Sequence, residues 1–171
     1  MLAAARRLFA ANGYAQTSVR AIAAEADVNQ ALVVTYFGGK DALFMEAVGR
    51  FEVPHAFAGG TEDLGARIAR AYVERWENMG DDDPWPALAR SAVSHEASAR
   101  LLRSALEEQY APLREVFGHS DEGRARMAMV QCLIGGMIME RYIYALEPAR
   151  SLPAATFEAA LAGLLQHAIS G

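Results

Sequence analysis

Residues 17–40 read TSVRAIAAEADVNQALVVTYFGGK, and this stretch decides the fold. A hydroxyl at Thr17 or Ser18 can cap a helix start, and an alanine-rich run then continues to Ala26. Ile22 and Ala26, four residues apart, lie on one helical face, which we expect to be buried. The first half of the stretch therefore predicts a short helix with one apolar side.

A sharp turn should follow this helix. Asp27 ends it, because its short carboxylate competes for backbone donors, and Val28 fills the corner from inside. Asn29, a residue type favoured at helix starts, begins a second helix that continues to about Phe37. Small alanines before the turn let the two axes approach closely. The pattern predicts a helix-turn-helix.

The second helix of this hairpin has an unusual outer face. Val33 and Phe37 should point inward with Val28. A mixture of apolar and polar side chains remains outside, a choice that suits the thymine methyls, base edges and phosphates of a DNA major groove. Placement of these apolar residues in a protein interface or in the core is the alternative. The outward residues are Gln30, Leu32, Val34, Thr35 and Tyr36.

The first 45 or so residues resemble the amino-terminal domain of TetR-type transcriptional repressors in order and spacing. The residues that carry the resemblance are Leu2, Ala4, Ala5, Leu8, Phe9, Gly13, Tyr14, Thr17, Ser18, Val19, Arg20, Ile22, Ala23, Ala26, Val28, Tyr36, Phe37, Lys40, Leu43 and Phe44. The resemblance implies a homodimeric, ligand-responsive repressor of double-stranded operator DNA.

Specific DNA contacts can be assigned on this reading. Gln30 and Thr35 would read base edges, and Leu32 would meet a thymine methyl. Lys40 begins a helix, where backbone amides and the helix dipole add to its charge. The residues expected to hold phosphates are Thr17, Arg20, Tyr36 and Lys40.

Two positions depart from the TetR pattern. The family usually carries Gly where this chain has Ala31, and a Tyr that touches the DNA backbone where it has Val34. Another group must supply that Tyr's phosphate contact, or the contact is lost. The sequence also begins at the family's first apolar position, so we assign no contacts to the short basic arm that often precedes it.

Composition points to an all-α protein of about nine helices. The chain has 171 residues, 53% of them hydrophobic and only six of them Pro, and it lacks the alternation of strands. We expect a DNA-binding domain over residues 1–46 and an effector-binding and dimerisation domain over 47–171. The expected helices cover residues 1–12, 17–26, 29–37, 40–57, 61–79, 84–94, 96–117, 121–146 and 153–169.

Charge is unevenly distributed along the chain. The formal net charge is −5, yet residues 1–50 hold five basic against four acidic side chains, and the rest carries a balance of −6. Only the first fifty residues suit a phosphate backbone, and weakly, so two copies should bind together. We expect dipole and solubility roles, not a metal site, for the acidic run 81–83.

The cellular compartment can be inferred from signals for disulfide bonding, export and membrane insertion, which the sequence does not show. A lone Cys132 excludes a disulfide framework, and we expect it to be buried and structural. No signal peptide is visible, and the longest apolar run, 127–139, is too short to span a bilayer. The sequence favours a cytoplasmic protein without membrane contact.

The last two helices carry surplus apolar surface, which predicts a homodimeric four-helix bundle, as in TetR-type proteins; burial in a monomer is the alternative. The expected interface residues are Leu133, Met137, Phe157, Leu161, Leu164 and Ala168.

Large apolar side chains and a few polar ones in the second domain predict a site for a small apolar or aromatic effector. The expected effector residues are Tyr72, Trp76, Trp85, Tyr110, Phe117, Gln131 and Arg141.

Other classes of function are weaker. The four histidines have no partner at metal-ligand spacing, and no nucleophile or carboxylate pair is placed for catalysis, so we expect no enzyme, metal or cofactor. A helical adaptor that binds a protein through the same hairpin is the alternative. Binding to duplex DNA that weakens steeply with salt would separate the repressor from the adaptor.

Overall fold

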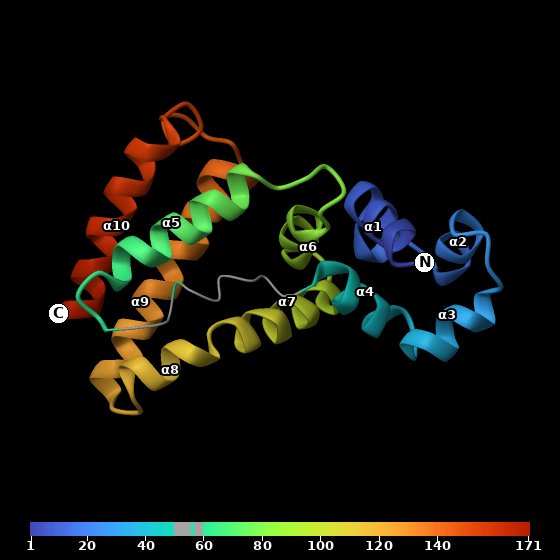
Figure 1. Ribbon diagram of the computed structural model, residues 1–171, viewed down its shortest axis with the longest axis horizontal. Helices are drawn as coiled ribbons and strands as arrows, with labels where there is room; N and C mark the ends of the chain where they lie inside the picture. Colours follow the sequence, from blue (N-terminus) through green and yellow to red (C-terminus); the bar gives the residue numbers. More distant parts are fainter. Residues whose placement is uncertain (50–55, 57–59) are drawn as a thin grey trace. The chain divides into compact units, whose positions relative to one another are not determined.

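The computed structural model describes residues 1–49, 56 and 60–171, and every regular element in these ranges is helical. Ten α-helices and one π-helical segment are present among the described residues, against the nine helices expected (Figure 1). The all-α prediction is confirmed. The chain divides into two compact units, Met1–Phe51 with Gly80–Gln109, and Glu52–Met79 with Tyr110–Gly171.

The first unit contains six helices. Their bounds are α1 Leu2–Gln16, α2 Val19–Glu25, α3 Gln30–Phe37, α4 Lys40–Val48, α6 Trp85–Ala92 and α7 Glu96–Gln109. Helix α1 packs on α2, α4, α6 and α7, and α3 packs on α2 and α4. The packing thus groups α6 and α7, which follow the predicted boundary at residue 46, with the amino-terminal helices.

Aromatic rings form the centre of this unit. The Phe9 and Phe44 rings meet edge to face with centroids 4.6 Å apart, and the Tyr14 ring meets Phe44 at 5.1 Å. Ile22 of α2 and Val33 of α3 are fully buried, as the hairpin pattern predicts. Close-packed rings and β-branched side chains hold the hairpin rigidly against α1 and α4.

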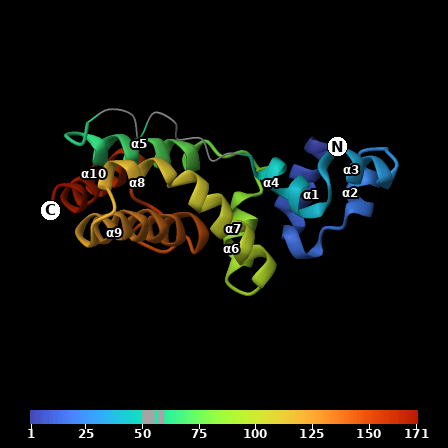
Figure 2. The same cartoon turned by 90° about the horizontal axis from the view of Figure 1, so that it is seen from below.

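The second unit contains the remaining helices. Their bounds are α5 Leu64–Glu77, α8 Ala111–Phe117, α9 Asp121–Met137, the π-helix η1 Ile138–Ile143 and α10 Ala154–Ser170. Helix α10 packs along α5 and α9, and both ribbon views show these three side by side (Figures 1 and 2). Buried apolar residues of these helices, Ile68, Tyr72, Ile134 and Leu165 among them, form its core.

One close contact sets the spacing of α5 and α10. Gly65 lies in the first turn of α5, where a Cβ atom would be 2.5 Å from the backbone nitrogen of Gln166 and 2.7 Å from the carbonyl oxygen of Ala162. The Gly65 amide donates to the Gln166 side-chain oxygen at 2.9 Å, and the Gln166 amide donates to the Thr61 carbonyl. Only glycine permits this approach of the two backbones.

Several helix boundaries differ from those expected. Helix α4 ends at Val48, because Gly49 adopts φ 66°; most of its predicted continuation to residue 57 lies outside the described residues. The helix expected over 96–117 is two, since Pro112 lacks the amide hydrogen that would continue the ladder. The helix expected to end at residue 146 becomes π-helical at Ile138 and stops at Ile143.

Candidate nucleic-acid interface

The turn between α2 and α3 is closed by a Schellman motif. The Asp27 amide donates to the Ala24 carbonyl at 3.2 Å, and the Val28 amide donates to the Ala23 carbonyl at 3.0 Å. Asp27 itself adopts φ 52°, a left-handed conformation that Asp tolerates better than most residues. The break predicted at Asp27 is confirmed, and its cause is this backbone geometry.

Side chains cap the starts of both hairpin helices. Ser18 accepts a hydrogen bond from the Ala21 amide at 3.0 Å, and Asn29 accepts one from the Ala31 amide at 2.8 Å. These bonds satisfy amide donors that have no partner within the helix. Ser18 is therefore the cap of α2, and Asn29 has the role expected from the sequence.

Thr17, expected to hold a phosphate, lies inside the unit. Its side chain is 2% exposed, and its hydroxyl donates to the carbonyls of Gly13 at 2.8 Å and Leu8 at 3.1 Å. Gly13 interrupts α1 with φ 72°, at the position where the sequence predicts the end of the helix. Thr17 thus fixes the end of α1, and its side chain is not presented to the surface.

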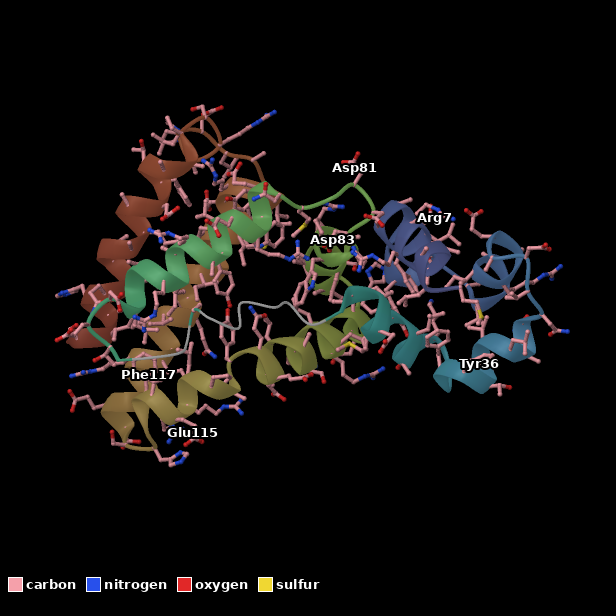
Figure 3. All side chains as sticks on the ribbon, in the orientation of Figure 1. Arg7, Tyr36, Asp81, Asp83, Glu115 and Phe117 are labelled. Carbon is pink, nitrogen blue, oxygen red and sulfur yellow. The ribbon has the colours of Figure 1, made fainter. Side chains whose placement is uncertain are left out.

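The outer face of α3 is the exposed surface that the sequence predicts. Val33 is buried and Phe37 half-buried, while the side chains expected to point outward are all exposed. Tyr36 is 71% exposed on the outer side of the helix (Figure 3). The Thr35 hydroxyl donates to the Ala31 carbonyl at 2.9 Å. The large apolar side chains exposed on this face are Leu32, Val34 and Tyr36, at 42%, 49% and 71%.

Lys40 begins α4 and lies on an aromatic platform. Its ammonium nitrogen is 4.2 Å from the centroid of the Tyr14 ring, a cation–π contact. Partial burial lowers the pKa of Lys40, and the neighbouring Asp41 acts in the opposite direction. The Tyr14 hydroxyl donates to Asp41. Burial, followed by this carboxylate, raises the pKa of Tyr14 to about 12, so the phenol stays protonated at neutral pH.

Three arginines near the hairpin have different settings. Arg20 of α2 is exposed, as its predicted phosphate role requires. Arg7 of α1 instead binds Glu25 of α2 at 3.0 Å (Figure 3). Arg6 donates to the Ala47 carbonyl at 3.0 Å and lies within 4 Å of two carboxylates of the acidic run. Arg6 and Arg7 are thus held by carboxylates of the first unit, whereas Arg20 is exposed.

Sequence comparison identifies both parts of the chain. The family model described as bacterial regulatory proteins, tetR family, matches residues 1–47, and the one described as tetracyclin repressor-like, C-terminal domain, matches residues 62–169. The chain belongs to the TetR family. No curated protein sequence matches the chain.

Solved structures agree with this assignment. A TetR-family regulator from Streptomyces coelicolor A3 is 32% identical, with a TM-score of 0.72 over 99% of this chain and 92% of that one. GusR of Salmonella enterica, at 20% identity, has a TM-score of 0.69 over 96% and 93%. A transcriptional regulator of Pseudomonas aeruginosa PAO1, at 23% identity, has a TM-score of 0.70 over 99% and 88%. The likeness of this chain to the last two structures is one of fold alone.

The two departures from the TetR pattern lie on the exposed face. Ala31 and Val34 are both exposed, and Val34 is 49% so. A valine cannot donate a hydrogen bond to a phosphate as a tyrosine hydroxyl does. Tyr36, two residues along α3, is the exposed phenol of this helix.

The structure separates the residues expected to bind an effector. Trp85 belongs to the first unit, and the other six belong to the second. Burial raises the pKa of Tyr110 to about 12, and a hydrogen bond with Tyr72 acts in the opposite direction. Trp76 stacks on Tyr142 with ring centroids 5.2 Å apart. Tyr72, Tyr110 and Trp76 are buried, while Phe117 is half-buried.

Arg141 has a structural setting that the sequence does not reveal. The residue is 7% exposed, and its guanidinium donates to the Glu77 carboxylate at 2.8 and 3.0 Å and to the carbonyls of Leu152 and Ala149. These bonds fasten the segment before α10 to η1 and α5. Gln131, the other polar residue expected to bind an effector, is only half-buried.

The predicted dimer residues fall into three groups. Met137 and Leu161 are 5% and 6% exposed, so they belong to the core of the subunit. Leu133, Phe157 and Ala168 are half-buried. Leu164, at 58% exposure, is a true surface residue. Helical periodicity predicts the apolar stripe of each helix, but it does not predict which side of that stripe faces outward.

The outward face of α9 could not be predicted from the sequence. Met129, Cys132 and Gly136, spaced three and four residues apart, are exposed on this helix. The expectation that Cys132 is buried is wrong, since an almost uniformly apolar helix gives no periodicity from which to find its outer face.

Asp83 is buried beside the start of α6 and accepts a hydrogen bond from the Trp85 amide at 2.9 Å, which agrees with a helix-start role (Figure 3). In residues 1–49, 56 and 60–171, no cluster of three or more His, Cys, Asp or Glu is placed to hold a metal ion. None of the helices described there is long and apolar enough to cross a membrane.

Proposed function

We propose that the protein is a ligand-responsive transcriptional repressor that binds a palindromic operator as a homodimer and releases it when a small apolar or aromatic effector binds. The observation that carries this proposal is the outer face of α3, which presents exposed Leu32, Val34 and Tyr36 beside polar Gln30 and Thr35. Membership of the TetR family supports it independently.

The DNA contacts follow from this face. Gln30 in the first turn of α3 can bind an adenine edge with two hydrogen bonds, and Leu32 contributes apolar contact to a thymine methyl. Arg20, Tyr36 and Lys40 hold phosphates on either side. Thr17 is left out of the contacts, since its hydroxyl already bonds to two carbonyls of α1.

Two copies are required because one hairpin carries little positive charge. The exposed side chains of α9 and α10 provide the surface for a four-helix bundle across a two-fold axis, with Leu164 near its centre and Met129 and Cys132 beside it. A symmetric pair of α3 helices then explains why the operator should be palindromic. Such a repressor acts in the cytoplasm, where the DNA is.

The effector would bind within the second unit. Tyr72, Trp76 and Tyr110 are large, buried and largely apolar, and the hydrogen-bonded phenols could exchange their bond for one with a ligand. Arg141 is excluded, because its guanidinium already makes four hydrogen bonds, two to Glu77 and one each to Leu152 and Ala149. Coupling between effector and operator should be about 1–3 kcal/mol, the usual range for allosteric proteins.

Selection of bound sequences from a random duplex pool tests the DNA-binding part. The full chain should enrich a palindrome; Gln30→Ala should change the preferred base at one position of each half-site, at about 1–3 kcal/mol, whereas Lys40→Ala should weaken all duplexes nearly alike. An unchanged preference and affinity in Gln30→Ala would remove that assignment. Binding to protein that is insensitive to salt, with no duplex binding, would favour an adaptor instead.

A further inference from the structure

The start of α4 is held by a residue from outside the helix-turn-helix. Arg100 of α7 lies with its guanidinium nitrogen 3.7 Å from one carboxylate oxygen of Asp41. The other oxygen of Asp41 accepts the hydrogen bond of the Tyr14 hydroxyl. One carboxylate at the start of α4 thus binds α1 through a phenol and α7 through a guanidinium.

This carboxylate is the immediate neighbour of Lys40. Without partners, its negative charge would draw the Lys40 ammonium toward itself and repel a phosphate that approaches the helix start. Its two partners change that balance, because Arg100 adds a positive charge and Tyr14 uses one oxygen lone pair. With Arg100 present, Lys40, Asp41 and Arg100 together carry a charge of +1; without it they are neutral.

The Lys40 ammonium also has a fixed resting place. It lies 4.2 Å from the centre of the Tyr14 ring, and that ring is 8% exposed and packs edge to face on Phe44 at 5.1 Å. A ring held on one side by Phe44 and at its hydroxyl by Asp41 cannot swing away. The cation–π contact therefore holds the ammonium of Lys40, the first residue of α4, on the Tyr14 ring.

We propose that Arg100 and Tyr14 are positioning residues for the phosphate contact of Lys40: by binding Asp41 they leave the Lys40 charge available to DNA. The inference rests on the proposed function, since it takes duplex DNA as the partner of Lys40. It makes α7, a helix that follows residue 46, part of the machinery that sets affinity for DNA.

Arg103 provides a matched control. It lies on α7 three residues from Arg100, has a similar exposed fraction, 60% against 62%, and binds Glu96 at 2.8 Å. Arg100→Gln and Arg103→Gln therefore remove the same charge from the same helix. A general loss of positive field would affect both variants alike, and a specific action on Asp41 would affect only the first.

The experiment measures dissociation constants of the full chain for a short duplex of arbitrary sequence, at several salt concentrations. At 0.1 M salt we expect Arg100→Gln to weaken binding about fivefold, Arg103→Gln by less than about twofold, and Arg100→Lys to restore most of the affinity. Asp41→Asn should bind at least as tightly as the parent, and Arg100→Gln should then lose its effect in the Asp41→Asn background.

Each outcome has a definite meaning. Equal losses in Arg100→Gln and Arg103→Gln, or an undiminished effect of Arg100→Gln in the Asp41→Asn background, would overturn the positioning role while leaving the repressor intact. A parent chain that binds no duplex would overturn the proposed function and this inference together, whereas Lys40→Gln with unchanged affinity would overturn this inference alone. Each variant should fold, because all the altered side chains except Lys40 are largely exposed. Circular dichroism spectra and melting temperatures that match those of the parent chain check this.

Discussion

Gly65→Ala should destabilise the protein, although alanine is the better helix former. The added Cβ would lie 2.5 Å from the Gln166 nitrogen, 2.7 Å from the Ala162 oxygen and 2.8 Å from the Gln166 Cα. All three are backbone atoms of α10, so the contact cannot be relieved by a change of rotamer. The two helices must separate, which stretches the 2.9 Å hydrogen bond from the Gly65 amide to Gln166.

The expected magnitude is the difference between two effects. Overpacking costs about 1–3 kcal/mol or more, and the separation of α5 from α10 removes further contacts, whereas alanine returns at most about 1 kcal/mol of helix propensity. A net loss of about 2 kcal/mol should lower the melting temperature by roughly 4–8 °C for a chain of this size.

Thermal and urea unfolding, followed by circular dichroism, measures the loss. Gly163→Ala is the control, because this glycine lies on α10 with no atom within 4 Å of the added Cβ, and it should leave stability unchanged or raise it by up to about 1 kcal/mol. If Gly65→Ala melts at or above the parent temperature, the close approach of the two helices at this point does not exist in solution.

Three further predictions address the turn, the surface and a buried phenol. Asp27→Gly should raise stability by about 1 kcal/mol, since glycine adopts φ 52° without strain; an unchanged urea midpoint would argue against this conformation. Leu164→Glu should give folded monomers in sedimentation, whereas Leu161→Glu, 6% exposed, should unfold the subunit; a dimeric Leu164→Glu would refute the interface. Because the folded pKa of Tyr110 is about 12 and the unfolded one about 10, its contribution to stability is complete below pH 10 and is lost as pH rises toward 12, so Tyr110→Phe should flatten the alkaline fall of stability seen in unfolding curves.

The hairpin could be predicted because its signals are local. Asp27, Asn29 and Gly38 act through hydrogen bonds and backbone angles within a few residues, and each has the conformation or bond that its type favours. The helical class could be predicted for the same reason, since apolar spacing within one helix is visible in the sequence. The resemblance to the TetR family added that these residues occur in the order and spacing of a known DNA-binding domain.

Contacts between distant residues were not predictable in this way. The Tyr14–Asp41 bond joins residues 27 apart, and the Arg141–Glu77 pair joins residues 64 apart. A single sequence does not say which of many acidic residues Arg141 meets, so its ion pair with Glu77 could not be predicted. Leu161 and Leu164 lie on one predicted stripe, and only the packing of α10 on α5 and α9 decides which faces inward.

The bond from Thr35 to the Ala31 carbonyl has a consequence for the operator sequence. A hydroxyl has one proton, and here that proton is already donated within α3. Toward a base, Thr35 therefore presents oxygen lone pairs and a methyl group, a combination that suits the amino groups of adenine or cytosine and the methyl of thymine. Guanine offers only acceptors at the corresponding edge. The base opposite Thr35 should be one that donates a proton or brings a methyl group, and guanine should be rare there.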